Sequence, residues 1–436
     1  MIEKNEIYIT DIESYGCNGE GIAHIDGFPV FIENALKGEK VKILAVKVLK
    51  NFGYGKLLEV LEPSDARRDV ICPVFKRCGG CQLLHMEYQE QLLLKTQIVE
   101  DCMRKFSGLS DFQVAPCEGA ESPFNYRNKA QYPVKGREVG FYAQRSHDLI
   151  PVEKCLMQNE ADEKYIEIVK NYAHSEDIRH LYTRTGDGEQ MVVLVSACRK
   201  LRDEAWLVEK FKEAGATTLV QNINTKNTNV ILGGENKVLY GTGKIEGRIG
   251  SLKFSVSPHS FFQINTKQTE KLYGKGKELL ELKGTERLMD LYCGIGSIGL
   301  FMADKVKSVI GVECIPQAIE NAKENAKKNG ISNAEFMVGL SEEVFPMLMK
   351  KGEMPDIVVV DPPRKGCDEK LLTTLLEYTP EKILYISCNP STLARDLKIL
   401  SEKYDVGTVY PYDLFPNTRH VECCVRLWRK TDRRGC

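Results

Sequence analysis

The sequence predicts an α/β protein in three parts: a small β-barrel, a central α+β region and a C-terminal doubly wound parallel sheet. Residues 7–62 contain only short β-type runs separated by Gly, Asn and Asp turns. From residue 256 onward, short apolar runs alternate with segments of helical period. This alternation is typical of a parallel sheet covered by helices on both faces. Because 436 residues are too many for one hydrophobic core, we expect domains at 1–62, 69–255 and 256–436.

The first domain has the pattern of a Greek-key barrel of the OB type. Its expected strands are Ile7–Ile12, Gly21–Ile25, Pro29–Phe31, Val41–Val48 and Gly55–Val60. Such barrels commonly bind nucleic acid, although a fold does not establish a function. The formal net charge of -1 gives no overall sign of a nucleic-acid partner. Residues 40–77 nevertheless carry more basic than acidic side chains, which fits a phosphate-binding surface or a solvated face.

The fifteen cysteines of the chain need separate interpretation. The N-terminus lacks the pattern of a signal peptide, and no apolar run is long enough to span a bilayer. We therefore expect a cytoplasmic protein with reduced thiols. Cys72, Cys78 and Cys81 have the spacing C-x5-C-x2-C with Gly-Gly between the last two, and Cys155 lies far downstream. Four thiolates can hold an iron–sulfur cluster or a structural zinc ion, and the spacing leaves both open.

The central region mixes helical and strand patterns. Apolar residues at helical spacing predict a helix over 88–107, whose apolar stripe is expected to pack on the C-terminal domain. Residues 124–129 and 140–145 interleave aromatic and basic side chains, as in surfaces that stack bases and contact phosphates. Exposed β-hairpins use the same residues. The other expected elements are strands Met191–Ala197, Thr218–Gln221 and Val230–Leu232 and a helix over Asp203–Glu213.

The C-terminal alternation predicts ligand binding outside the carboxyl ends of the strands. The expected elements are helix Gln268–Leu282, strand Arg287–Leu291, helix Ser297–Asp304, strand Ser308–Val312, helix Pro316–Asn329, strands Ala334–Val338 and Ile357–Val360, helix Glu369–Tyr378, strand Ile383–Ile386, helix Ser391–Leu400, and strands Val406–Tyr410 and Val421–Trp428. No helix is expected between residues 338 and 357.

A glycine loop follows the first of these strands. The stretch from Asp290 to Gly299 contains G-x-G-x-x-G, and Glu313 ends the second strand. These features permit a dinucleotide site. A carboxylate at Asp290 would repel a pyrophosphate, however, and suits the ammonium-bearing cofactor S-adenosylmethionine, whose ribose hydroxyls Glu313 would bind. The sequence therefore favours the sulfonium cofactor.

Three further residues follow or precede strands of the same sheet. Asp361 precedes two prolines, which fix it in the expected cleft. Cys388 lies on a strand-to-helix turn, where the helix N-terminus is expected to lower its pKa and favour a nucleophile. A small apolar residue that ends a strand is the alternative. Glu422 begins the last strand on the same face as His420, although a Glu in such a position is usually solvated.

Together these motifs resemble the RNA uracil-5-methyltransferase family, and most closely its iron–sulfur-containing 23S ribosomal RNA branch. The resemblance covers nearly the whole chain and implies a TRAM domain in the barrel, carried by Gly19–Gly27. It implies [4Fe–4S] ligands at Cys72, Cys78, Cys81 and Cys155, cofactor or active-site positions at Gln263, Tyr292, Glu313 and Asp361, a nucleophile at Cys388 and a general base at Glu422. The segment Gly339–Ser341 departs from the acidic or amide residue often found there, so a backbone contact to adenine is expected.

The resemblance also implies an activity and its partners. S-adenosylmethionine would donate a methyl group to C5 of uridine in 23S ribosomal RNA through a covalent adduct between Cys388 and C6. The flipped base would enter the site from RNA held by the barrel, and the protein is expected to act as a monomer. The alternatives are uracil-5 methylation of tRNA, methylation of an exocyclic amine, and a non-catalytic iron–sulfur protein that binds RNA.

Overall fold

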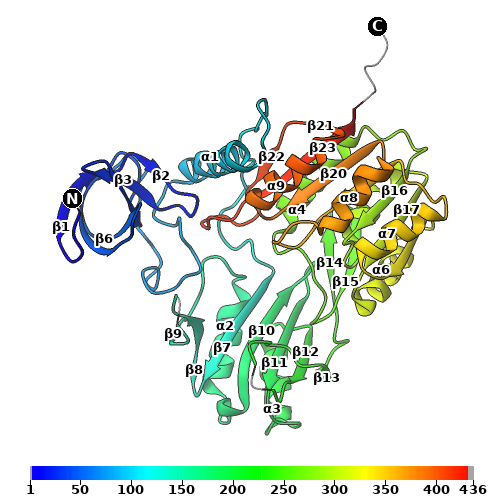
Figure 1. Ribbon diagram of the computed structural model, residues 1–436. Helices are drawn as coiled ribbons and strands as arrows, with labels where there is room; N and C mark the ends of the chain where they lie inside the picture. The colour runs from blue at the N-terminus through cyan, green and yellow to red at the C-terminus, as the bar shows by residue number, and fades with distance from the viewer. Residues whose placement is uncertain (1, 145, 227, 431–436) are drawn as a thin grey trace.

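The computed structural model describes residues 2–144, 146–226 and 228–430. Figure 1 shows a barrel (blue) beside a larger α/β domain (yellow to red), with a central sheet (cyan to green) below them. In the described ranges, no helix combines the length and the apolar character needed to cross a membrane. The expected barrel, mixed central region and doubly wound C-terminal sheet are confirmed.

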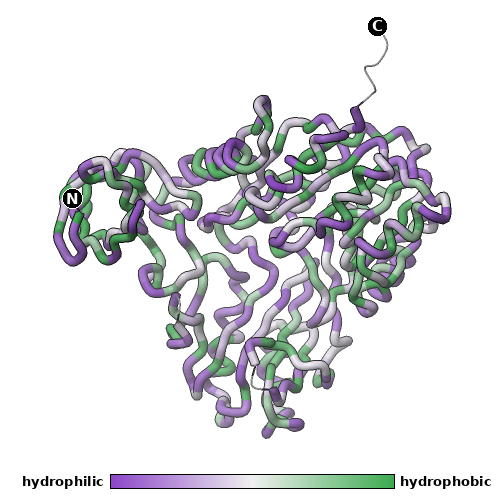
Figure 2. Tube along the Cα trace, in the orientation of Figure 1, coloured by the Kyte–Doolittle hydropathy of each residue, from purple (hydrophilic) through white to green (hydrophobic). Residues whose placement is uncertain are grey.

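The barrel is a sheet of six strands in the order β1-β5-β6-β4-β3-β2. Its strands are β1 (Ile7–Asp11), β2 (Ser14–Tyr15), β3 (Gly21–Ile25), β4 (Phe28–Glu33), β5 (Lys40–Val48) and β6 (Gly53–Glu62). Alternate side chains such as Val30, Ile32, Val41 and Ile43 are fully buried inside it, and Figure 2 shows the same alternation of hydrophobic and hydrophilic residues around the ring. Only the short β2 was not expected.

The central sheet has seven strands in the order β13-β12-β11-β10-β7-β8-β9. Its elements are β7 (Lys129–Lys135), β8 (Glu138–Tyr142), β9 (Leu149–Pro151), α2 (Ala161–Asn171), η1 (Ser175–Asp177), β10 (Ile178–Thr185), β11 (Gln190–Ser196), α3 (Glu204–Glu213), β12 (Thr218–Ile223) and β13 (Glu235–Tyr240). The strand expected at Val230–Leu232 is wrong. Asn224 Nδ2 donates to the carbonyls of Val230 (2.7 Å) and Ile231 (2.9 Å), so these groups close a loop instead of joining a ladder.

The C-terminal sheet has eight strands, with β18-β17-β16-β19-β20 parallel and β23 antiparallel beside β20. A hairpin of β14 (Ile245–Ile249) and β15 (Leu252–Val256) precedes it. Its elements are α4 (Thr266–Leu280), β16 (Arg287–Leu291), α5 (Ser297–Met302), η2 (Ala303–Lys305), β17 (Ser308–Glu313), α6 (Pro316–Lys328), β18 (Ala334–Val338), α7 (Ser341–Lys350), β19 (Ile357–Val360), α8 (Glu369–Tyr378), β20 (Lys382–Ser387), α9 (Pro390–Leu400), β21 (Tyr404–Val406), β22 (Tyr410–Tyr412) and β23 (Glu422–Arg429). The strand order reverses between β16 and β19, which is where such sheets bind ligands.

Two differences from the sequence prediction concern this domain. Helix α7 was missed because Pro346 lies inside it, and proline usually interrupts a helix. Val344 and Leu348 are nevertheless buried at helical spacing. The single strand expected over 406–410 is split into β21 and β22, because Val409 bonds instead to the segment around Val114.

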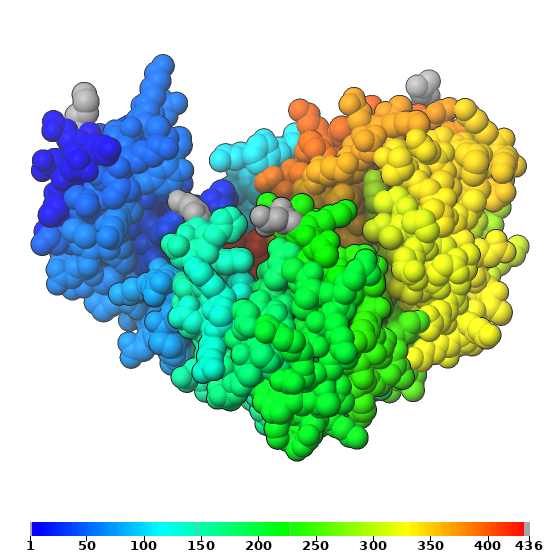
Figure 3. Space-filling model, turned by 90° about the horizontal axis from the view of Figure 1, so that it is seen from below, coloured from blue at the N-terminus to red at the C-terminus, as the bar shows by residue number. Residues whose placement is uncertain are grey.

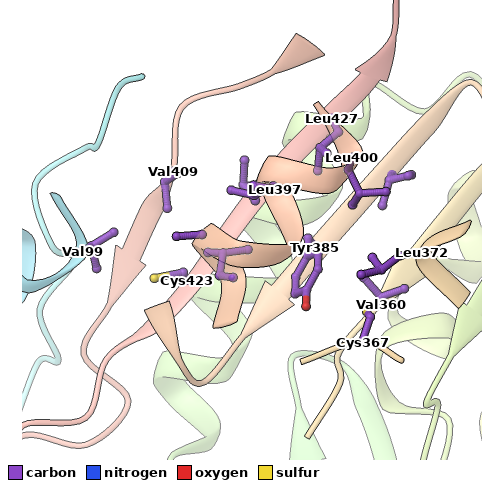
Figure 4. Close-up of a cluster of buried hydrophobic side chains, with 14 of the residues drawn as sticks. Val99, Val360, Cys367, Leu372, Tyr385, Leu397, Leu400, Val409, Cys423 and Leu427 are labelled. Atoms are coloured by element: carbon purple, nitrogen blue, oxygen red, sulfur yellow. The ribbon is translucent and has the colours of Figure 1, made fainter. Parts of the chain in front are cut away.

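The helix predicted over 88–107 is α1 (Tyr88–Phe106), and it packs against α9. Figure 4 shows Val99 of α1 near Leu397 of α9 and Cys423 of β23, and all three belong to one hydrophobic cluster. A helix that lies outside the C-terminal domain in sequence thus completes its core.

Candidate active site

The candidate site lies at the carboxyl edge of the C-terminal sheet. Leu291 at the end of β16 pairs with Val312 of β17 and with Val360 of β19. Val360 pairs in turn with Tyr385 of β20. The residues that follow these strands therefore meet at one edge, beside the reversal of strand order.

The glycine loop after β16 turns sharply around this edge. Tyr292, Gly294 and Gly296 have φ values of 71°, 56° and 82°, in the left-handed region that glycine adopts at little cost. Gly294 N donates to Glu313 Oε2 (3.3 Å), and Ile315 N donates to Glu313 Oε1 (3.0 Å). A side chain at Gly294 would meet no atom within 4 Å. The loop therefore borders open space beside a carboxylate, which can accept hydroxyl groups of a ligand.

Asp290 lies beneath this loop, and its suitability for an ammonium-bearing cofactor stays a prediction. Its side chain is fully buried, and its Oδ2 accepts a hydrogen bond from Gly299 N (2.8 Å). Burial, with smaller contributions from the carboxyl groups of Asp361 and Glu313, raises the pKa of Asp290 to about 7. Asp290 anchors the first turn of α5 and so holds the glycine loop from beneath.

Gln263 reaches the same edge from the segment before α4. Its backbone oxygen accepts a hydrogen bond from Asn128 Nδ2 (2.8 Å), which ties this segment to the start of β7. Tyr273 of α4, which the sequence did not single out, is fully buried with its hydroxyl 3.2 Å from Ser297 Oγ. Burial and the nearby Asp361 carboxyl raise the pKa of Tyr273, and hydrogen bonds from the Ser297 and Gln263 side chains oppose the rise. Tyr273 thus links Gln263 to the glycine loop.

Cys388 and Glu422 lie across from one another at the edge. Ser387 of β20 pairs with Cys423 of β23 in an antiparallel ladder, and Cys388 and Glu422 are the next positions along the two strands. Residues directly opposite in such a ladder have Cβ atoms about 4.5–5.5 Å apart. Because Cys423 points into the hydrophobic cluster (Figure 4), alternation turns Glu422 to the opposite face of β23.

The electrostatics of this pair differ from the sequence expectation. Burial, followed by the carboxyl groups of Glu422 and Asp361, raises the pKa of the Cys388 thiol to about 11, and Arg364 opposes the rise. Burial and Asp361 raise the pKa of Glu422 well above its ordinary value, and its side chain is only 8% exposed. Burial raises the pKa of Asp361 to about 7, while burial and Arg364 lower that of His420 to about 4. The expected lowering of the Cys388 pKa is wrong because two carboxyl groups and burial outweigh the helix N-terminus.

The loop that carries Asp361 is fastened to the turn that carries Cys388. Asn389 caps α9 by accepting a hydrogen bond from Ser391 N (3.1 Å). The Asn389 side chain also donates to Arg364 O (3.0 Å), and Thr392 Oγ1 donates to the same oxygen (3.3 Å). The two loops therefore hold a fixed relative position.

A buried carboxylate beneath these loops was not found by sequence reasoning. Asp396 of α9 is fully buried, and its Oδ2 accepts from Tyr385 OH (2.6 Å) and Cys367 N (2.8 Å). Its Oδ1 accepts from Arg395 Nε (2.8 Å). The only sequence signal was an acid on the apolar side of a helix, and its role is to position the Asp361 loop against the Cys388 strand.

The segment before Glu422 is held by α1. Lys95 and Asp413 are both fully buried, and Lys95 Nζ lies 2.5 Å from Asp413 Oδ1. Asn417 adopts a φ of 64° and its Oδ1 accepts from Gln91 Nε2 (3.1 Å) and Arg68 Nη2 (3.1 Å). Groups from the segment after the barrel and from α1 thus fix the path of the chain into β23.

The four cysteines expected to bind a metal lie in one region, apart from this edge. Cys72, Cys78, Cys81 and Cys155 are half-buried free thiols. Burial and the nearby Cys155, Cys78 and Cys72 raise the pKa of Cys81 to about 12, and Arg127 opposes the rise. Within the described ranges, no three His, Cys, Asp or Glu side chains converge closely enough to hold a single metal ion. Burial raises the pKa of the Cys155 thiol, and the backbone of Met157 and Gln158 opposes the rise, while Gln158 N donates to the Cys155 carbonyl (3.1 Å).

One basic residue of segment 124–129, Arg127, contacts groups of the protein itself. Arg127 lies beside the thiols and donates from Nε to Tyr126 OH (3.4 Å). Arg68 stacks over the ring of Phe124 at 5.7 Å. These contacts support the protein's own loops, and phosphate binding by the segment stays a prediction. Arg145, which ends the second such segment, lies outside the described residues.

Comparisons with known proteins agree with this geometry. The family described as tRNA (uracil-5-)-methyltransferase matches residues 87–430, and the TRAM domain matches residues 4–58. Uncharacterized RNA methyltransferases of Bacillus cereus (45% identical, covering 98% of each chain) and Clostridium tetani (43% identical, 98% of this chain and 97% of the other) are similar. A solved structure of Pyrococcus abyssi tRNA (uracil-54, C5)-methyltransferase in complex with S-adenosyl-L-homocysteine has a TM-score of 0.80 and 25% identity, covering 96% of this chain and 100% of the other.

Proposed function

The chain belongs to the tRNA (uracil-5-)-methyltransferase family, and we propose that it methylates C5 of uridine in 23S ribosomal RNA with Cys388 as nucleophile and Glu422 as base. It is an S-adenosylmethionine-dependent RNA uracil-5-methyltransferase with an N-terminal TRAM domain. One observation carries the proposed roles: Cys388 directly follows, and Glu422 directly precedes, the last ladder pair Ser387–Cys423, at the edge where β19 delivers Asp361.

The proposed reaction needs a nucleophile because C5 of uracil does not attack a methyl group unaided. The ionised Sγ of Cys388 adds to C6, and the electron pair of the C5–C6 double bond makes C5 nucleophilic. S-adenosylmethionine, when bound, supplies the methyl group that C5 takes. Glu422 then removes the C5 proton, the C5–C6 double bond re-forms, and the Cys388–C6 bond breaks. A carboxylate of raised pKa suits the removal of a proton from carbon.

The residues at the edge fit a bound S-adenosylmethionine. Glu313 has both oxygens beside the open glycine loop and can accept the ribose hydroxyls. Asp361 is half-buried at the end of β19, where it can accept an N–H group. Gln263 and Tyr292 are proposed to flank the same space, from the segment before α4 and from the glycine loop. Isothermal titration of Glu313→Ala with S-adenosylhomocysteine should show weaker binding, while Cys388→Ala should bind as the wild type does.

The choice of RNA rests on the resemblance to the iron–sulfur-containing branch that acts on 23S ribosomal RNA. The similar Pyrococcus structure is of an enzyme that acts on tRNA uracil-54, so tRNA is the second candidate. Mapping 5-methyluridine in 23S ribosomal RNA and in tRNA, from cells with and without the protein, decides between them. Loss confined to tRNA would overturn the 23S assignment. Methylation retained by Cys388→Ala would overturn the uracil-5 mechanism.

We also propose that Cys72, Cys78, Cys81 and Cys155 hold a [4Fe–4S] cluster. Four free, half-buried thiols in one region supply the donor set. Each cysteine of such a cluster binds a different iron, so the ligands surround a cube and need not converge on one ion. An iron–sulfur cluster fits the reduced thiols expected of a cytoplasmic protein. We also propose that the protein acts as a monomer.

The metal content provides the test of the cluster. Anaerobically purified protein should contain iron and acid-labile sulfide, and Cys81→Ala should lose both. Cys198, another free half-buried cysteine, provides the matched control, because Cys198→Ala should keep the iron of the wild type. Zinc in place of iron and sulfide would refute the cluster.

A further inference from the structure

Three aromatic rings gather on the outer surface of the barrel. Phe31 and Phe52 have ring centroids 5.6 Å apart, Phe52 and Tyr54 5.6 Å, and Phe31 and Tyr54 6.0 Å. Phe31 and Phe52 are partly exposed and Tyr54 is 39% exposed. The cluster is therefore open to a ligand along one side.

The rings are not part of the barrel core. Val30 and Ile32, which flank Phe31 in β4, are fully buried inside the barrel, so alternation directs Phe31 outward. Tyr54 lies between Gly53 and Gly55, and a side chain at Gly55 would come within 2.8 Å of Ile43. The inward positions on either side of Tyr54 are occupied by glycine. The Tyr54 ring therefore lies on the outer surface and is not part of the core.

Basic side chains border the rings. Lys47 of β5 lies directly opposite Tyr54, which pairs in turn with Phe31 of β4, so the three share one face. Lys50 lies at the exposed tip of the hairpin that Leu49 N closes on Phe52 O (2.9 Å). Aromatic rings that stack bases, bordered by cations that attract phosphates, are the usual composition of a surface for single-stranded nucleic acid.

The rings are connected to the candidate active site through one loop. A side chain at Gly16 would lie 3.3 Å from the Phe31 ring, so the loop between β2 and β3 packs beside that ring. In the same loop, Asn18 Oδ1 accepts a hydrogen bond from Arg419 Nη1 (2.8 Å), three residues before Glu422. In Figure 1 the blue loop and the red segment meet between barrel and α/β domain, and Figure 3 shows a notch between the barrel and the rest of the molecule.

We propose that Phe31, Phe52 and Tyr54 form a stacking platform for an unpaired base of the substrate RNA near the target uridine. The platform would hold one flanking nucleotide while the uridine leaves its stack and reaches Cys388, which offsets part of the cost of flipping. The identity of the RNA as substrate rests on the proposed function, whereas the stacking site rests on the barrel surface alone.

Binding of a short, unstructured RNA of mixed sequence tests the platform, with fluorescence anisotropy at fixed salt as the readout. Tyr54→Ala should weaken binding by about 5- to 150-fold, the range for loss of one base–aromatic stack. Tyr54→Phe keeps the ring and should bind as the wild type does, whereas Tyr54→Leu should bind as poorly as Tyr54→Ala. Leu58→Ala changes a residue of similar exposure on the same strand (44%) and should have no effect.

The outcomes separate the platform from the proposed function. Unchanged binding by Tyr54→Ala would overturn the platform and leave the methylation reaction untouched. Wild-type affinity of Tyr54→Leu would show a merely apolar contact, which also overturns it. A wild-type protein that binds the short RNA through Tyr54 but methylates no RNA would refute the proposed function alone. Because Tyr54 lies outside the core, we expect an unchanged thermal midpoint for Tyr54→Ala, which excludes unfolding as the cause of weaker binding.

Discussion

Replacing Glu422 by glutamine should lower the pKa of the Cys388 thiol. The thiol pKa of about 11 is raised first by burial and next by the Glu422 carboxylate. The ionised carboxylate of wild-type Glu422 would repel a thiolate at Cys388. Glutamine keeps the size of the side chain and removes the charge, so only burial and Asp361 still raise the pKa, and Arg364 still opposes them.

The magnitude follows from the ladder geometry. Opposite positions lie about 5 Å apart, and two unit charges at that distance interact by about 3 kcal/mol at an effective dielectric constant of about 20. One pKa unit corresponds to about 1.4 kcal/mol, so the Glu422→Gln thiol should titrate about two units below the wild-type value. Burial, the largest cause, is unchanged, and the pKa should therefore stay above about 8.5.

Alkylation by iodoacetamide measures this pKa because only the thiolate reacts. The rate at Cys388 is followed by mass spectrometry of its peptide across a series of pH values, which separates it from the other cysteines. Glu422→Asp retains the charge and should titrate near the wild type. If the midpoint of Glu422→Gln shifts by less than about half a unit, the two side chains do not face each other and our reading of the ladder is wrong.

Three further predictions concern the proposed roles. Glu422→Gln should accept the methyl group and then accumulate a covalent adduct between Cys388 and RNA on denaturing gels, whereas slow turnover without an adduct would refute its role as the base. Asp396→Asn should lower kcat more than it raises KM, because the Asp361 loop loses an anchor while RNA contacts remain. If the fall in kcat at saturating substrate is matched by a corresponding fall in the unfolding free energy, the role of Asp396 is merely structural. Lys95→Met should cost about 3–5 kcal/mol of unfolding free energy in urea, because it leaves Asp413 as an unpaired buried charge, and adding Asp413→Asn should restore part of it.

The sequence predicted the C-terminal sheet well because the strands of this sheet are short apolar runs between clear helical patterns. It missed α7 because Pro346 suggested an interruption, although the buried residues around it keep helical spacing. The strand expected at Val230–Leu232 failed for a different reason. The side-chain amide of Asn224 donates hydrogen bonds to the carbonyl groups of Val230 and Ile231. A local sequence pattern carries no information about such a partner.

The candidate site was predictable where its residues follow strand ends, as with Asp361 and Cys388. The direction of the Cys388 pKa shift was not predictable. The helix N-terminus can be recognised in the sequence, but the position of Glu422 opposite Cys388 is set by strand pairing. Tyr273 and Asp396 were missed for the same physical reason. Their hydrogen-bond partners are distant in sequence or on other elements, so only the folded chain identifies them.

The chain that leads into the strand of Glu422 is held by residues of the N-terminal half. Asn417 stands in a left-handed conformation that bulky residues avoid, and it is kept there by hydrogen bonds to Gln91 and Arg68. Arg68 lies just before the four-cysteine region, and α1 supplies both Gln91 and the buried Lys95. The glycine loop, in contrast, is held by Asp290 from within the C-terminal domain. In the proposed mechanism, methyl donation and proton removal therefore depend on different parts of the fold.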